Sequence, residues 1–215
     1  MNKMVRQRLI WLAVFVAAML MAPLSVTHQV DEVISTALRS YGAHWPPLQL
    51  IWVVGGAPLT LLLVLLMAWT RARHNRPWSG VVVGFIVGTL AEVLVKHWIP
   101  TPTPSNVVPP PFYRSLITAT NIDPQQVMHW VALVMGRTSL ASGPSHLLKG
   151  TFPSGHLFRL SYVTIIALQG IKQKWWVTAG VLVAAFAVVA TGGHWFWDTV
   201  GGYALAQLTV IWLVP

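Results

Sequence analysis

His194 and Asp198 are the two residues whose types and spacing best suit chemistry. They are four positions apart, which places them on one face of a helix, where the carboxylate can accept the imidazole N–H and hold the other ring nitrogen toward a substrate. Such a histidine is poised to act as a nucleophile or a base. The pair can equally be an interfacial histidine followed by an aspartate that complements the positive end of a helix dipole, and the spacing alone favours neither interpretation.

A second candidate lies in the segment Phe-Pro-Ser-Gly-His at 152–156. The proline suits the start of a helix, Ser154 can cap that helix, and Gly155 allows another group to approach the backbone closely. Free N–H groups at a helix start favour an anion. Ordinary capping explains the proline and the serine but leaves the position of His156 unaccounted for, so this segment taken alone favours neither capping nor anion binding.

The composition indicates that these residues belong to a membrane protein. Of 215 residues, 55% are hydrophobic and 9% are charged, whereas about a quarter of the residues in an ordinary soluble domain are charged. The mean hydropathy is +0.62. The net charge of +9 does not indicate nucleic acid binding, because the basic residues lie in short clusters at the ends of apolar segments. The absence of cysteine excludes disulfides, thiolate metal sites and cysteine nucleophiles.

Six apolar segments are long enough to cross a hydrocarbon layer as helices. They predict an all-α integral membrane protein, one domain over 1–215, with six transmembrane helices at about 9–27, 47–70, 77–97, 153–171, 175–193 and 194–214. Basic residues cluster before the first span, after the second and after the fourth, at Lys3, Arg6, Arg8, Arg71, Arg73, Arg76, Lys172 and Lys174. By the positive-inside rule both termini are expected in the cytoplasm and the loop 98–152 outside, in a bacterial inner membrane.

The first span has a second interpretation. Its basic start, its apolar stretch and the small residues near Ala22 and Ser25 also suit a cleaved signal peptide. We favour retention, because the segment is long and shows no A-x-A cleavage site. Residues 28–46, which follow it, predict a short amphipathic helix on the outer surface.

The expected orientation brings the polar candidates to one membrane face. Lys96 ends the third span, His156 begins the fourth and His194 begins the sixth, all at outer ends. Ionisable residues at membrane depth are candidates for function. For a lysine such as Lys96, however, snorkelling toward water is the commonest explanation.

Together these residues resemble the type 2 phosphatidic acid phosphatase superfamily, the lipid phosphate phosphatases that share a six-helix membrane core with vanadium haloperoxidases. The family pattern reads K-x6-R-P, then P-S-G-H, then S-R-x5-H-x3-D. This sequence has, in the same order, Lys96 with Pro104, PSGH at 153–156, and H-W-F-W-D at 194–198 followed by Gly201 and Gly202. The resemblance covers residues 77–214, and its core region contains the outer loop 98–152.

The resemblance implies a role for each matching residue. His194 would attack phosphorus and form a phosphohistidine, Asp198 would orient this histidine, and His156 would protonate the leaving oxygen. Phosphate oxygens would be bound by Lys96, Ser154 and the Gly155 amide. These roles fit the residues' own chemistry, because phosphoryl transfer needs an in-line nucleophile, a proton donor and donors for the negative charge. The scheme requires no metal and no other cofactor.

The sequence departs from the family pattern at both phosphate-binding arginines. Thr103 stands at the first position, and Ala187 with Val188 stands at the second Ser-Arg pair. Removing one such donor typically costs about a hundred- to a thousandfold in rate. The missing cations therefore need a replacement if the chain is an enzyme.

Arg159 is the best replacement candidate, because it lies three residues after His156 and faces the same way, about 4.5 Å deeper along the helix. An arginine at that depth needs an anionic partner. The partner is either phosphate or Glu92, which lies one turn below Lys96 and can pair with either cation. Phosphate binding and structural pairing both remain open for Arg159. Further cations, whose commoner explanation is a solvated charge, lie in the outer loop at Arg114, Arg137 and Lys149.

The sequence therefore predicts a metal-independent phosphatase that hydrolyses a lipid mono- or diphosphate, polyprenyl or glycerolipid, at the outer leaflet. Its partners are expected to be the lipid phosphate and membrane lipids. The length of loop 98–152 suits a lid or a headgroup-selecting cap. Three alternatives stay open: a lipid phosphotransferase that passes the phosphoryl group to a lipid or sugar hydroxyl, a noncatalytic member that binds anionic lipid, and a metal hydrolase that uses His156, His194 and Asp198.

Overall fold

The computed structural model describes residues 2–99, 101–102, 104, 150–169 and 175–214. The regular secondary structure of this part of the chain consists of helices, with no strand. Its helices are α1 (Lys3–Met21), α2 (Ser25–His44), α3 (Pro46–Val54), α4 (Ala57–Arg73), α5 (Ser79–Trp98), α8 (Gly155–Ala167), α9 (Trp175–Ala190) and α10 (Phe196–Leu213).

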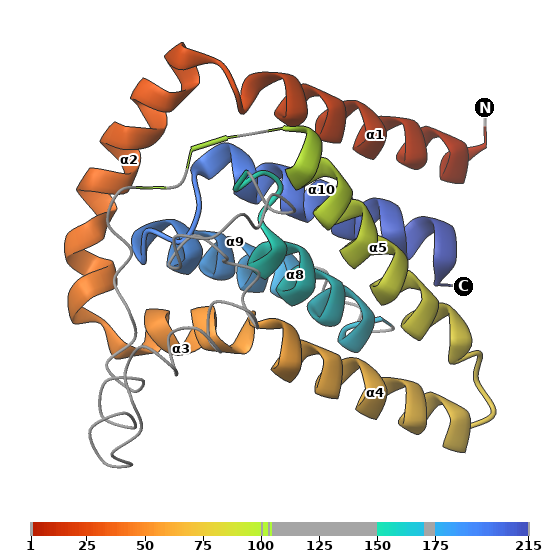
Figure 1. Cartoon of the computed structure of the whole chain (residues 1–215). Helices are drawn as coiled ribbons and strands as arrows, with labels where there is room; N and C mark the ends of the chain where they lie inside the picture. Colours follow the sequence, from red (N-terminus) through yellow and green to blue (C-terminus); the bar gives the residue numbers. More distant parts are fainter. Residues whose placement is uncertain (1, 100, 103, 105–149, 170–174, 215) are drawn as a thin grey trace.

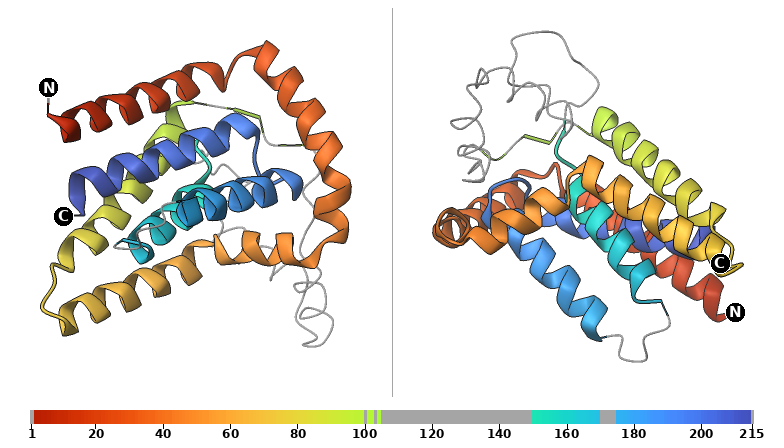
Figure 2. Two further views of the ribbon diagram at one scale, coloured as in Figure 1. Left: turned by 180° about the vertical axis from the view of Figure 1, so that it is seen from behind. Right: turned by 90° about the horizontal axis from the view of Figure 1, so that it is seen from below.

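The longer helices form a bundle whose centre is the pair α8 and α10 (Figure 1). The helix α10 packs against α1, α5, α8 and α9, and α8 packs against α4, α5 and α9. The helix α2 crosses one end of this bundle and is seen almost end-on in the right-hand view of Figure 2. The start of α1 and the end of α10 lie together at the opposite end (Figure 1). The bundle therefore has one end that carries the termini and another that is covered by α2.

The first two predicted spans need correction. The first span, expected at 9–27, is α1 at 3–21, which ends before Pro23 because proline has no N–H with which to continue the helical hydrogen bonds. The second span, expected at 47–70, is interrupted: α3 and α4 are separated at Gly55 and Gly56, and Pro58 lies in the first turn of α4. Glycine weakens a helix, and proline suits a helix start, so the break follows from local sequence. The segment expected as a short amphipathic helix at 28–46 is α2, which spans 20 residues.

The remaining predicted spans, 77–97, 153–171, 175–193 and 194–214, correspond to α5, α8, α9 and α10. By length and composition, two helices in the described residues are long and apolar enough to cross a membrane, α1 and α5, and α9 is a shorter apolar helix. The full set of six transmembrane spans therefore stays a prediction.

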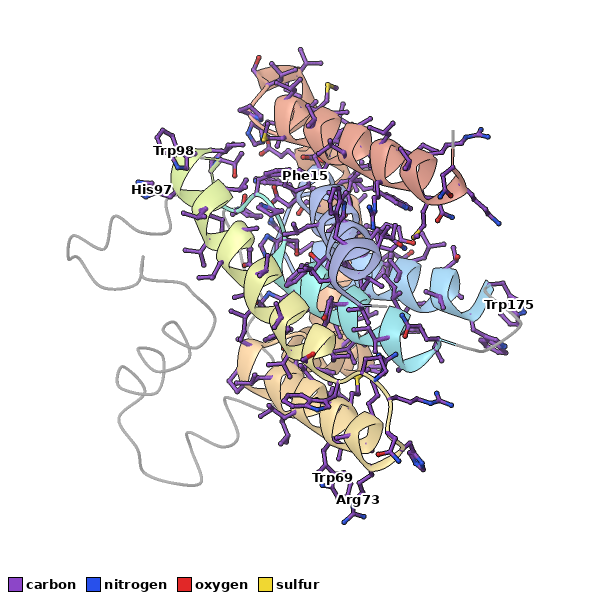
Figure 3. The ribbon with its side chains drawn as sticks, turned by 90° about the vertical axis from the view of Figure 1, so that its right-hand side faces the viewer. Phe15, Trp69, Arg73, His97, Trp98 and Trp175 are labelled. Atoms are coloured by element: carbon purple, nitrogen blue, oxygen red, sulfur yellow. The ribbon has the colours of Figure 1, made fainter. Side chains whose placement is uncertain are left out.

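The outer surface of the bundle carries apolar side chains that a soluble protein would cover. Leu62 on α4 and Leu182 on α9 are 61% and 64% exposed. Exposed tryptophans lie at both ends: Trp98 ends α5, while Trp69 lies in the last turns of α4, beneath the guanidinium of Arg73 at 4.0 Å, and both project outward in Figure 3. An apolar belt with tryptophan at its two edges is the pattern of a helix bundle in lipid.

Close packing fixes α8 against α5 and α10. Phe158 and Tyr162 are fully buried at the centre of the main core, and the Tyr162 hydroxyl donates to the Val81 carbonyl at 2.6 Å. Gly88 of α5 allows this contact, because a Cβ there would lie 2.2 Å from the Phe158 ring. The position of α8 along the bundle is thereby set, and with it the position of the residues in its first turn.

Candidate active site

Three helix ends meet near the end of the bundle that α2 crosses (Figure 1): the last turn of α5 and the first turns of α8 and α10. They bring together residues that the sequence predicted to share one face. All of these predicted site residues are buried: Lys96, Ser154, Gly155, His156, Arg159, His194 and Asp198. The structure therefore brings the expected residues together. Lys96 and His194, the first of them and the last of the three helix ends, are 98 positions apart in the sequence.

His194 and Asp198 contact each other as expected, although only the aspartate lies in the helix. His194 precedes α10, and its Nδ1 lies 3.4 Å from Asp198 Oδ2. The same carboxylate oxygen accepts the backbone N–H of Trp195 at 3.1 Å. The carboxylate thus holds both the imidazole and the turn that carries it, which leaves Nε2 as the ring nitrogen directed away from Asp198.

The segment 152–156 is held directly on α10. Ser154 caps α8, since its Oγ accepts the N–H of Leu157 at 3.2 Å, and its backbone N–H donates to the Asp198 carbonyl at 2.8 Å. Gly202 makes this contact possible, because a Cβ there would lie 2.4 Å from the Ser154 carbonyl oxygen. His156, in the first turn of α8, has its ring centroid 5.8 Å from that of His194. Capping therefore explains Ser154, and the same packing places the two histidine rings side by side.

Glu92 pairs with both candidate cations. Its Oε1 accepts from Lys96 Nζ at 2.7 Å and its Oε2 from Arg159 Nη1 at 2.9 Å. Arg159 Nε donates to the carbonyl of Gly55 at 3.1 Å, an acceptor that the break between α3 and α4 releases from the helix. The structural pairing considered for Arg159 is thus formed, and the interruption of the second span contributes to it.

Sequence reasoning missed one member of the cluster, Asp31 of α2. This carboxyl is 2% exposed and lies near the backbone N–H groups of Phe196 and Trp197 at the start of α10. Burial raises its pKa from 3.8 to about 7, with a further rise from the nearby Asp198 carboxylate, while the two N–H groups oppose the rise. A signal was present in the sequence: Thr27, Asp31 and Ser35 are spaced four apart and all buried, a polar stripe on the inner face of α2.

The two positions at which the family pattern has arginine are accounted for differently. Ala187 and Val188 are fully buried in α9 and provide no donor to the site. Thr103 lies outside the described residues, as do the loop cations Arg114, Arg137 and Lys149. Arg159 and Lys96 are therefore the cations that the described part of the chain brings to the histidines.

The ends of loop 98–152 are tied to each other beside the site. Thr101 Oγ1 accepts the backbone N–H groups of Thr151 and Phe152 at 2.9 and 3.0 Å, and the two threonine hydroxyls lie 3.0 Å apart. Trp195 Nε1 donates to the Pro102 carbonyl at 2.7 Å. The loop thus leaves and re-enters the bundle at one point, next to the turn that carries His194.

The metal-site alternative finds little geometric support. Over the described ranges, no group of three or more His, Asp or Glu side chains is arranged to hold a metal ion. His156, His194 and Asp198 are neighbours but do not form such a group. The arrangement instead offers an imidazole oriented by a carboxylate, a second histidine and two cations.

Comparison with known proteins agrees with the predicted fold. No protein-family model and no curated protein sequence matches this chain. A solved structure, the transmembrane PAP2-type phosphatidylglycerolphosphate phosphatase from Bacillus subtilis, matches with a TM-score of 0.61 and 18% sequence identity, over 97% of this chain and 92% of that one. At this identity the likeness shows the fold, which is that of a PAP2-type membrane protein.

Proposed function

We propose that this chain, which has the fold of a transmembrane PAP2-type phosphatase, is itself a lipid phosphate phosphatase of that superfamily. The observation that carries the proposal is the buried cluster in which His194 contacts Asp198, His156 lies beside them, and two cations lie at the same helix ends. Ion pairs that serve only to connect two helices do not require two histidines and an aspartate beside them. Phosphoryl transfer requires these groups together.

In the first step of the proposed reaction, Nε2 of His194 attacks the phosphorus atom of the substrate. The P–N bond forms as the P–O bond to the lipid breaks, and His156 gives its proton to the departing lipid oxygen. Asp198, at 3.4 Å from Nδ1, orients the ring and stabilises the positive charge that develops on it. Lys96, Arg159 and the first turn of α8 stabilise the charge on the phosphoryl oxygens.

In the second step, water replaces the lipid oxygen. His156, now neutral, accepts a proton from the water as its oxygen attacks phosphorus, and the P–N bond breaks to release phosphate and restore His194. The residues of the described cluster supply every group that these two steps need, so the proposed chemistry is independent of metal ions.

The membrane orientation is part of the proposal. The basic residues at the start of α1 and at the end of α4 belong to the end of the bundle that carries the termini, and the first turns of α8 and α10 lie toward the end that α2 crosses (Figure 1). The positive-inside rule then places the site at the outer leaflet, facing the periplasm or exterior of a bacterial inner membrane. The proposed substrate class is a lipid mono- or diphosphate with a polyprenyl or glycerolipid tail.

The test is phosphate release by the purified protein in detergent with EDTA, from a panel of glycerolipid and polyprenyl phosphates. We expect release that survives EDTA and is abolished in His194→Ala. The matched control is His97→Ala, since His97 is exposed and projects outward beside Trp98 (Figure 3), and this variant should keep the wild-type rate. Equal rates in the wild type and His194→Ala would refute the proposal.

Hydrolysis and transfer are separated in the same assay. A phosphotransferase forms the same phosphohistidine but passes the phosphoryl group to an added lipid or sugar hydroxyl, so it yields a phosphorylated acceptor instead of inorganic phosphate. Labelled phosphate recovered on His194 without either product would indicate that the correct acceptor is missing. Binding of anionic lipid with neither labelling nor product would favour the noncatalytic alternative.

A further inference from the structure

Glu92 lies where the proposed phosphate has to bind. The residue is 4% exposed, and its two carboxylate oxygens contact Lys96 Nζ at 2.7 Å and Arg159 Nη1 at 2.9 Å. The carboxylate also lies against the first residue of α8, because a Cβ on Gly155 would be 1.9 Å from Glu92 Oε1. His194 is close enough to interact with it electrostatically. One carboxylate thus touches both cations and the glycine of the PSGH segment.

These are the groups assigned above to the phosphate oxygens. Ammonium and guanidinium groups bind carboxylates and phosphates through the same charge-assisted hydrogen bonds, and the two oxygens of a carboxylate can replace two oxygens of a phosphate. In the described part of the chain, Glu92 forms ion pairs with Lys96 and Arg159, and Ala187 and Val188 stand where the family pattern has its second arginine. A phosphate therefore has to share or take over the donors of Glu92.

A purely structural role makes a different prediction. Buried cations in a membrane protein need an anionic partner, and removing that partner leaves uncompensated charge. If Glu92 served only that purpose, its loss would weaken the protein and would not improve the binding of anions. If the carboxylate occupies the phosphate position, its loss frees two donors and removes a repulsive charge, and anion binding improves.

We propose that the Glu92 carboxylate is a built-in occupant of the phosphate site, which holds Lys96 and Arg159 in place and yields them when phosphate enters. The proposal rests on the phosphate-binding role given to these cations above. It explains why two cations can remain buried without substrate, and it makes Glu92 a residue that limits affinity for the phosphoryl group.

The test is equilibrium binding of radiolabelled inorganic phosphate to the full-length protein in detergent. We expect Glu92→Gln, which keeps the shape but removes the charge, to bind phosphate at least about tenfold more tightly than the wild type. The control is Glu32→Gln, an exposed carboxyl of α2, which should bind as the wild type does. Adding Arg159→Met to Glu92→Gln should abolish the gain. Unchanged or weaker binding by folded Glu92→Gln would overturn the proposal.

A second variant keeps the test decisive if Glu92→Gln does not fold. Glu92→Asp retains the charge but withdraws it by one methylene, so it should also bind phosphate more tightly, by a smaller factor, and a lack of any gain would count equally against the proposal. Lipid phosphatase assays on the same samples separate the two claims. If Glu92→Gln binds phosphate more tightly but no sample hydrolyses lipid phosphate, the proposed function alone is refuted. If lipid phosphate is hydrolysed but Glu92→Gln shows no gain in phosphate binding, the role of Glu92 alone is refuted.

Discussion

Replacing Asp31 by asparagine is expected to stabilise the protein at neutral and alkaline pH. In the folded protein, burial raises the pKa of this carboxyl from 3.8 to about 7. Between these two values the folded state binds more protons than the unfolded chain, so the free energy of unfolding falls as the pH rises through this interval. At about 1.36 kcal/mol for each pKa unit, the full loss is about 4 kcal/mol. Asparagine keeps an oxygen for the N–H groups at the start of α10 and carries no charge.

The assay is the apparent melting temperature of the detergent-solubilised protein between pH 4 and pH 8. At pH 8 Asp31→Asn should melt about 10 °C above the wild type, and the difference should shrink as the pH falls toward 3.8, because the folded wild-type carboxyl is then protonated and uncharged. Glu32→Gln, the exposed neighbour on α2, should show no such pH-dependent difference. A difference that stays constant over the whole pH range would refute the reasoning, because the stabilisation would then not come from the charge of Asp31.

Three further substitutions test the packing and the contacts around the site. Gly202→Ala should lower the free energy of unfolding by roughly 1–3 kcal/mol, because its Cβ would lie 2.4 Å from a backbone oxygen. Gly180→Ala, whose Cβ would have Thr164 Cγ2 as its nearest neighbour at 3.7 Å, should raise it by up to about 1 kcal/mol. Equal effects of the two substitutions in denaturant titrations would contradict the tight packing at Gly202. Arg159→Lys should lower kcat for lipid phosphate by at least about a hundredfold, because an ammonium group cannot keep both contacts of the guanidinium, and a rate within tenfold of wild type would show that the guanidinium is dispensable. Thr101→Val should lower the melting temperature by removing the acceptor of two buried N–H groups, and an unchanged value would mean that these groups find other partners.

The sequence predicted the helices and the histidine cluster well where the signal is local. An apolar segment that ends in tryptophan marks α5, and an apolar segment that begins with a capping motif marks α10. The spacing of His194 and Asp198 correctly predicted their contact. The break at Gly55 was missed, although a glycine pair followed by Pro58 is a local signal for a helix end and a new start. The average hydropathy over residues 47–70 does not reveal this break.

Other features depend on tertiary contacts that no local pattern specifies. Glu92 could be placed beside Lys96 from spacing alone, but its contact with Arg159 depends on how α5 and α8 pack. Asp31 is not among the site residues expected from the sequence. Its burial requires α2 to cross the bundle and meet the first turn of α10, an arrangement that the amphipathic pattern of α2 permits but does not determine.

The tie between Thr101 and Thr151 separates the length of loop 98–152 from the geometry of the helices that carry the candidate site. Since both ends of the segment are fixed at one point by hydrogen bonds, residues can be inserted or deleted between them without moving this point, and the entropic cost of closing a loop grows by about 0.6 kcal/mol for each doubling of its length. The segment is therefore a natural site for grafting. Exchanging the residues between 102 and 150 should leave the helix ends that carry His156 and precede Asp198 in place, and evolution has the same freedom.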